Sequence, residues 1–234
     1  MQRHTMRMIA GAAALALLAP NAARAENDGT AAAADYRPTG LAVTWDGSGN
    51  MTWTQPDATS WSGATYETGD FATFAGAGQG TVTLSGTITP GGVTVSAGAY
   101  TFGGTAIAGD GGLTVSGGTL TLDNAANTYT GDTVVDSGAK LLINLDNRLP
   151  CGAVKGDATV EGTLTLNNRN QALNGLNGSA SGLIDKLGDQ ARTLTLGAGD
   201  ASGTFDGMIR RTGGILLVTK TGGGTQILSG TNRY

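Results

Sequence analysis

Histidine and cysteine are almost absent from this 234-residue chain, which has one of each, His4 and Cys151. A lone cysteine cannot form an intrachain disulfide. His4 lies in a segment that we expect to be removed, so the remaining chain has no imidazole. This excludes Ser-His-Asp and Cys-His catalysis and every zinc or iron site that uses histidine. We therefore expect no catalytic, cofactor-binding or metal-binding residues.

Basic residues are scarce as well, with 14 Lys and Arg against 18 Asp and Glu. Loss of Arg3, Arg7 and Arg24 with a signal peptide leaves 11 basic residues and a net charge of −7. An acidic surface disfavours phosphate backbones and anionic lipids. We expect no nucleic acid partner, and no membrane span in the mature chain.

The N-terminal residues have the pattern of a signal peptide. Arg3 and Arg7 precede an apolar run, Met8–Ala19, which is shorter than the ~20 residues that cross a bilayer. Ala23-Arg24-Ala25 then forms a small-residue cleavage site. The sequence predicts a signal peptide over residues 1–25 and export through the inner membrane.

Glycine and threonine are abundant, with 40 and 34 copies. Short β-branched runs alternate with glycine and asparagine turns, which is typical of short strands in a stacked β-fold. Helical patterns are almost absent. The best helical candidate, Ser181–Ala191, is predicted to be an insertion or loop.

From Gly80 onward, apolar-polar-apolar triplets recur, and each places two apolar side chains on one face of a strand. The first residues of the later triplets are spaced 21, 23, 30 and 22 positions apart: Leu120, Leu141, Leu164, Leu194 and Leu216. A repeat of this length predicts a solenoid in which these leucines form inward columns. A β-sandwich, the rival interpretation, would not require a fixed register.

The residues before the repeats differ in composition. Residues 26–40 are predicted to be a flexible linker and residues 41–79 an N-terminal cap, followed by repeats over 80–234. Seven of the twelve aromatic residues lie between Tyr36 and Phe74, including all three tryptophans. Because an open solenoid end exposes strand edges, we predict that these rings form the cap. The alternative is a platform on which sugar rings stack.

Four segments of the sequence resemble parts of one protein family. The stretch DNAANTYTGDTVVDSGAKLLI (Asp123–Ile143) resembles the passenger-associated repeat of autotransporters. Leu149–Ser179 and Gly203–Tyr234 resemble other parts of the same unit. Thr44–Trp61 is similar to the cap that often precedes such repeats in large bacterial surface proteins.

This resemblance implies an all-β fold, a right-handed parallel β-helix with an atypical aromatic N-terminal cap. It also implies a type V, autotransporter-like secreted protein located at the cell surface, in the outer membrane or outside the cell. Such proteins share a scaffold rather than an activity, and many are adhesins. Because Tyr234 falls inside a repeat, we expect a truncated C-terminus and a missing partner, either a C-terminal barrel translocator or further repeats.

Several acidic motifs are candidates for chemistry. The pairs Gly109-Asp110, Gly131-Asp132 and Gly156-Asp157 are spaced 22 and 25 residues apart, so a solenoid could stack them as a carboxylate column. A pectin-lyase-like enzyme would use such acidic residues to bind calcium or for acid-base catalysis. Such enzymes also place Lys or Arg beside the acids, and here the only basic residue nearby is Lys155. The preferred interpretation is that they are turn residues.

Other motifs are weaker. Asp46-Gly47-Ser48-Gly49 and Asp136-Ser137-Gly138 superficially resemble a serine-protease element, but no histidine is available to activate a serine. Gly197–Asp200 is a single copy of a calcium-repeat-like motif. Cys151 is predicted to be inert.

Two classes of function remain. The first is a structural or adhesive surface module that contacts a host surface or a carbohydrate, and is not an enzyme. The second is a polysaccharide-acting β-helix enzyme.

Overall fold

The alternation of apolar and polar residues produces short strands that stack in parallel, in a computed structural model that describes residues 40–234. The predicted signal peptide (1–25) and the predicted linker (26–40), apart from Gly40, lie outside the described residues. Among the described residues, the only helix is a single 3-10 turn, η1 (Ala198–Asp200). None of their helices is long and apolar enough to cross a membrane.

Most of the strands belong to two eight-stranded sheets. The first contains β1 (Ala42–Trp45), β3 (Trp61–Ser62), β4 (Phe71–Ala75), β6 (Gly92–Ala97), β8 (Leu113–Val115), β10 (Thr133–Val135), β12 (Ala158–Val160) and β15 (Leu176–Asn177). The second contains β2 (Thr52–Trp53), β5 (Gly80–Leu84), β7 (Ala99–Gly104), β9 (Thr119–Leu122), β11 (Lys140–Ile143), β13 (Thr163–Asn167), β16 (Leu183–Leu187) and β19 (Met208–Arg211).

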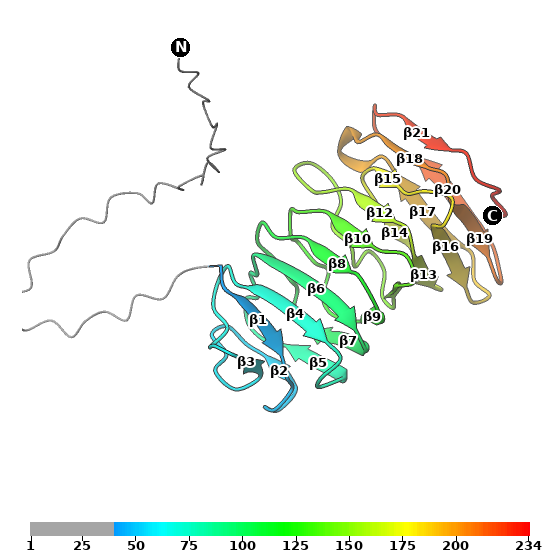
Figure 1. Cartoon of the computed structure of the whole chain (residues 1–234). Helices are drawn as coiled ribbons and strands as arrows, with labels where there is room; N and C mark the ends of the chain where they lie inside the picture. Colours follow the sequence, from blue (N-terminus) through cyan, green and yellow to red (C-terminus); the bar gives the residue numbers. More distant parts are fainter. Residues whose placement is uncertain (1–39) are drawn as a thin grey trace, which may run out of the picture. The chain divides into compact units, whose positions relative to one another are not determined.

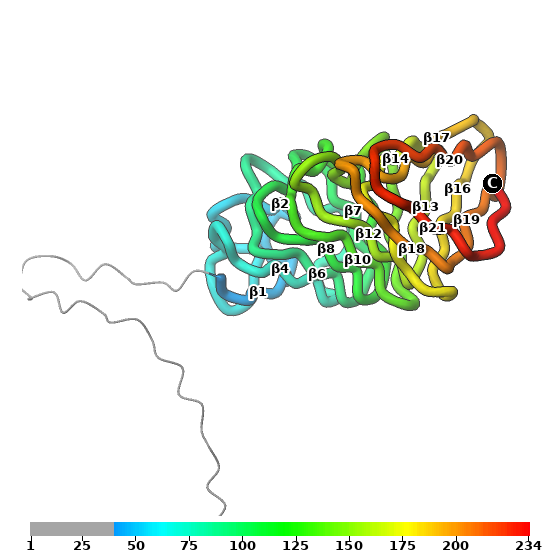
Figure 2. Tube along the Cα trace, turned by 90° about the horizontal axis from the view of Figure 1, so that it is seen from above, coloured from blue at the N-terminus to red at the C-terminus, as the bar shows by residue number. Residues whose placement is uncertain are grey.

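Two smaller sheets accompany the later turns. One contains β14 (Gln171–Ala172), β17 (Arg192–Leu196) and β20 (Leu216–Lys220), and the other contains β18 (Gly203–Phe205) and β21 (Gln226–Leu228). Every strand pair is parallel except β1 with β3. The chain therefore winds as a β-solenoid of about eight turns, confirming the predicted fold class (Figures 1 and 2).

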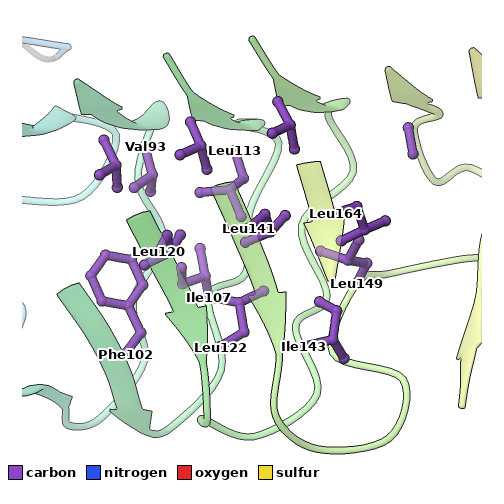
Figure 3. Packing of buried hydrophobic residues seen from close by; sticks show 14 of the residues in the cluster. Val93, Phe102, Ile107, Leu113, Leu120, Leu122, Leu141, Ile143, Leu149 and Leu164 are labelled. Carbon is purple, nitrogen blue, oxygen red and sulfur yellow. The ribbon is translucent and has the colours of Figure 1, made fainter. Parts of the chain in front are cut away.

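The predicted leucine column is present in the second sheet. Leu141 pairs directly with Leu120 on one side and with Leu164 on the other, and Figure 3 shows the three in successive turns. The whole column is at most 2% exposed and consists of Tyr100, Leu120, Leu141, Leu164, Ile184 and Ile209. Burial of each such leucine contributes about 1.5–3 kcal/mol, so the column is a main source of stability.

Two details of the predicted register are wrong. The column continues from Leu164 to Ile184, whereas Leu194 lies in the smaller sheet beside Gln171 and Val218. The predicted insertion or loop, Ser181–Ala191, contains strand β16. The sequence did not predict this strand, because the charged residues Asp185 and Lys186 occupy the positions that Thr165 and Leu166 fill one turn earlier.

Both charged side chains of β16 have partners that permit burial. Asp185 accepts from Arg210 Nη2 and Thr212 Oγ1, each at 2.8 Å. Lys186 is fully buried and its Nζ donates to the carbonyls of Gly188, Gln190 and Gly213. A buried charge is tolerated where such hydrogen bonds replace water.

Aromatic rings fill the N-terminal end of the solenoid. Trp53 lies 5.2 Å from Tyr66 and 5.3 Å from Trp61 between ring centroids, and Phe74 lies 4.9 Å from Phe102. The three tryptophans are at most 5% exposed, so they form a core and not the alternative sugar-stacking platform. The edge of the first sheet is closed by β3, which pairs antiparallel with β1.

Candidate functional site

The three predicted Gly-Asp pairs do not form one column. Thr133 pairs with Ala158, which places Gly131-Asp132 in register with Gly156-Asp157. Leu113 pairs with Thr133, however, so Gly111 and Gly112 occupy the equivalent positions one turn earlier. Asp110 is therefore displaced by two residues, and the expected carboxylate column has only two members.

The two aligned carboxylates bond to the backbone of the following turn. Asp132 Oδ1 accepts the N–H of Asp157 at 2.9 Å, and Asp157 Oδ1 accepts the N–H of Gly175 at 2.8 Å. Lys155 Nζ donates to the carbonyl of Thr128 and forms no ion pair within residues 40–234. These contacts are those of turn residues, as preferred from the sequence.

Four glycines stack where each turn enters the first sheet, and we name them the glycine corner: Gly91, Gly111, Gly131 and Gly156. A Cβ on Gly156 would lie 2.5 Å from the carbonyl carbon of Gly131, and one on Gly131 would lie 2.7 Å from that of Gly111. No other residue type fits without displacing backbone.

Two hollows, each with a volume of about 360 Å³, lie at the N-terminal end of the glycine corner. They share Thr68. The first is lined by Gln55, Pro56, Glu67 and Thr68, and the second by Thr68, Gly69, Thr89, Pro90, Gly91, Gly109, Asp110 and Gly111. Together they form a depression that spans consecutive turns.

Gln55 fixes the wall between these hollows. Its Oε1 accepts the N–H of Thr89 at 2.8 Å, and its Nε2 donates to Thr89 Oγ1 at 3.0 Å and also to Thr68 Oγ1. The depression is therefore bounded by a side chain held from two turns. Sequence reasoning missed Gln55, because nothing in its local pattern marks it.

Phe71 is the only large hydrophobic side chain before residue 140 in the described part that is exposed, at 49%. Its ring lies beside the glycine corner, because Cβ atoms on Gly91 and Gly92 would come within 3.3 and 3.2 Å of it. The strand alternation could have revealed it, since Ala72 and Phe74 point inward and Phe71 therefore points outward.

The charge around the depression is of one sign. Residues 40–139 contain eight acidic residues and no basic residue. Glu67 and Asp110 line the hollows. An anionic ligand would be repelled here, whereas hydroxyl or ammonium groups would find acceptors.

The remaining sequence candidates are structural. Asp46 accepts from Ser48 N and Ser62 Oγ, and the Ser48 hydrogen bonds lower the pKa of this carboxyl. Asp200, in η1, accepts the N–H of Gly223 at 2.7 Å. Cys151 is half-buried, and burial raises the pKa of its thiol. Residues 40–234 contain no group of three or more side chains that could hold a metal ion.

The passenger-associated-transport-repeat family model matches residues 116–139 and 218–234. Two segments of the chain are therefore similar to this repeat. This confirms the resemblance to autotransporter passenger repeats, although residues 149–179 lie outside the matched segments. No curated protein and no solved structure matches the chain. With the β-solenoid, the repeats fit an autotransporter passenger segment, a family that implies secretion to the cell surface or extracellular space.

The two matched segments make the same contact with the preceding turn. Asn127 Oδ1 accepts the N–H of Ile107 at 2.8 Å, while the next residue, Thr128, donates its N–H to the Ile107 carbonyl at 2.8 Å. Asn232 Oδ1 and Arg233 N make the equivalent bonds to Ile209, at 2.9 and 2.8 Å. The Asn-X-Tyr part of the repeat therefore bonds to both the N–H and the carbonyl of one residue in the preceding turn. We name this pair of hydrogen bonds the Asn-X-Tyr clasp.

Proposed function

We propose that this chain is the passenger segment of a type V, autotransporter-like secreted protein, carried to the cell surface, where it has a structural and adhesive role. The adhesive surface is the depression at the glycine corner. Its ligand is a neutral or amino-sugar carbohydrate of a host or neighbouring surface.

The observation that most directly supports this proposal is the exposed ring of Phe71 beside the two hollows. Sugars present apolar C–H faces and hydroxyl rims, and they require both an aromatic or apolar surface and fixed hydrogen-bonding groups. Phe71 and Pro56 supply the first, and the carboxylate of Asp110 supplies the second. The lack of basic residues in 40–139 favours neutral or amino sugars over acidic ones at this depression.

The test is binding of the purified chain to immobilised neutral and amino-sugar oligosaccharides, compared with acidic ones. Phe71→Ala should weaken binding about two- to tenfold, since an aromatic contact contributes roughly 0.5–1.5 kcal/mol. Asp110→Asn should reduce the preference for amino sugars. Leu217→Ala is the matched control, because Leu217 is equally exposed, at 53%, and lies far along the sequence.

Equal losses in Phe71→Ala and Leu217→Ala would contradict the assigned surface, and absence of any glycan binding would contradict adhesion. Cleavage of an oligosaccharide during incubation, abolished by Asp132→Ala, would instead support the polysaccharide-acting enzyme.

A further inference from the structure

Three arginines lie at a second corner, beside the residues at which successive turns leave the second sheet. We name Arg148, Arg169 and Arg192 the arginine corner. Their guanidinium groups donate to carbonyls one turn earlier: Arg148 Nη1 to Asn124 at 2.6 Å, Arg169 Nε to Asn144 at 2.7 Å and Arg192 Nε to Asn168 at 2.6 Å. Each arginine is 24 or 25 residues from its acceptor, and the three arginines follow one another at intervals of 21 and 23 residues, so the contacts follow the turns of the solenoid.

Bonding to these carbonyls does not by itself require a charge. Elsewhere in the described turns, neutral amides perform the same task. Gln171 bonds to both the N–H and the carbonyl of Leu149, at 3.2 and 3.1 Å, and Asn174 does so for Gly152, at 2.7 and 3.0 Å. A role in stabilising the fold therefore does not explain why three positively charged side chains lie at this corner.

Within residues 40–234, none of the three arginines forms an ion pair with a carboxylate. The ion pair between described residues joins Arg210 to Asp185, at 2.8 Å, and includes none of the three. Asp123 and Asp146 lie along the corner, but their oxygens accept from Asn144 and from Asn170. Within residues 40–234, the Nη donors of Arg169 have no hydrogen-bond partner.

At the C-terminal end of this corner, Arg192 and Arg211 both lie near the buried Lys186. Burial lowers the pKa of Lys186, and the nearby charges of Arg192 and Arg211 lower it further, while Asp189 raises it. All ten basic residues of the described part follow residue 139, where seven acidic residues leave a net charge of +3. The acidic average of the chain therefore conceals a basic region.

We propose that the arginine corner binds an anionic polysaccharide, a chain that carries carboxylate, sulfate or phosphate groups along its length. Planar guanidinium groups match such anions in geometry and charge. The backbone carbonyls hold the arginines in place, so little side-chain entropy is lost on binding. Stacked turns repeat at about 4.8 Å, so the guanidinium donors recur at regular intervals along the solenoid axis. The anionic groups of a polysaccharide also recur at regular intervals along its chain. This site is separate from the glycine corner and does not depend on its function.

The test uses the full chain and a triple variant, Arg148→Gln, Arg169→Gln and Arg192→Gln. Glutamine keeps an N–H donor for the carbonyls while removing the charge. The control variant, Lys140→Gln, Lys220→Gln and Arg233→Gln, removes the same charge from exposed positions outside the corner. Binding to heparin, which is sulfated, and to polygalacturonate, which is carboxylated, is measured over a range of salt concentrations.

We expect the triple variant to bind at least tenfold more weakly, with a salt dependence whose slope falls by roughly one unit for each arginine replaced. The control variant should retain most of the affinity, and Phe71→Ala should leave this binding unchanged. If the triple variant unfolds, the three single substitutions serve instead, and each should weaken binding about threefold or more.

Equal weakening in the triple and control variants, or no polyanion binding by the unmodified chain, would overturn the proposal. Tighter binding of a duplex DNA oligonucleotide would replace the polysaccharide with nucleic acid. If the unmodified chain self-associates, the triple variant does not, and neither binds a polysaccharide, then the arginine corner binds the acidic region, residues 40–139, of a second copy instead.

Discussion

Residues 40–139 and residues 140–234 form turns of the same kind, but their side chains differ in charge and in core chemistry. The first region has eight acidic and no basic residues, whereas the second has seven acidic and ten basic residues. The first is filled at its N-terminal end by aromatic rings, and the second contains the buried Lys186. A solenoid fixes the backbone of each turn and leaves most side chains free to vary from turn to turn.

One inward column shows this change directly. Its paired members run from Val82 through Phe102, Leu122, Ile143 and Leu166 to Lys186. Strand pairing is unaffected where the aliphatic side chain is replaced by lysine, because three carbonyls accept from its Nζ. Hydrogen bonding can therefore replace apolar contact within a single column.

The largest expected effect is at the junction of the two regions. Leu141→Asp places an unpaired charge in the fully buried column between Leu120 and Leu164. We expect a loss of more than about 5 kcal/mol, seen as a collapse of the urea midpoint or of the β-sheet circular dichroism signal. Leu142→Asp, on the less buried side of the same strand, should cost far less. Similar losses for both would contradict the inward column.

Trp53→Ala tests the aromatic end. Trp53 is fully buried and packs against Trp61, Tyr66, Phe74 and Phe102. We expect a destabilisation of about 3–5 kcal/mol in denaturant unfolding, because such a cavity closes only partly. Phe71→Ala is the control from the same region and should change stability by less than about 1 kcal/mol. A mild Trp53→Ala variant would mean that the aromatic core is dispensable.

The Asn-X-Tyr clasp gives an intermediate effect that should differ between regions. Asn127 is buried, and Asn127→Ala leaves the Ile107 N–H unpaired and removes the side-chain bond to the Arg148 carbonyl, which keeps only the backbone N–H of residue 127. This should cost about 1–3 kcal/mol. Asn232→Ala removes one bond at a partly exposed position and should cost less. Urea unfolding midpoints of the two variants provide the measurement, and a larger effect at Asn232 would contradict the shared clasp.

The smallest effect concerns Glu161, whose pKa is lowered chiefly by the hydrogen bond from the Ser179 hydroxyl. Because its folded pKa lies below its ordinary value, Glu161 stabilises the fold above the ordinary value, and this stabilisation disappears as pH falls through the folded pKa. Ser179→Ala should move the pKa back toward the ordinary range in an NMR titration. An unchanged titration would show that Ser179 does not hold this carboxyl.

Period-2 alternation and the 21- and 23-residue spacings were sufficient to predict the solenoid and the Leu120–Leu141–Leu164 column. They failed at β16, because Asp185 and Lys186 are charged residues at buried positions, and several of their partners, Arg210, Thr212 and Gly213, lie one turn later. The turn role of Asp132 and Asp157 was predictable from sequence, whereas the displacement of Asp110 depends on an exact register. The hollows beside Gln55 and the arginine corner arise from contacts between turns, which composition alone does not reveal.

The most direct test of two separate binding corners is one experiment with two ligands and two variants. The purified chain, Phe71→Ala and the Arg148/Arg169/Arg192→Gln variant are each titrated with a neutral or amino-sugar oligosaccharide and with heparin. We expect Phe71→Ala to weaken only the first interaction and the arginine variant to weaken only the second. Equal effects of each variant on both ligands, or no effect of either, would contradict the account.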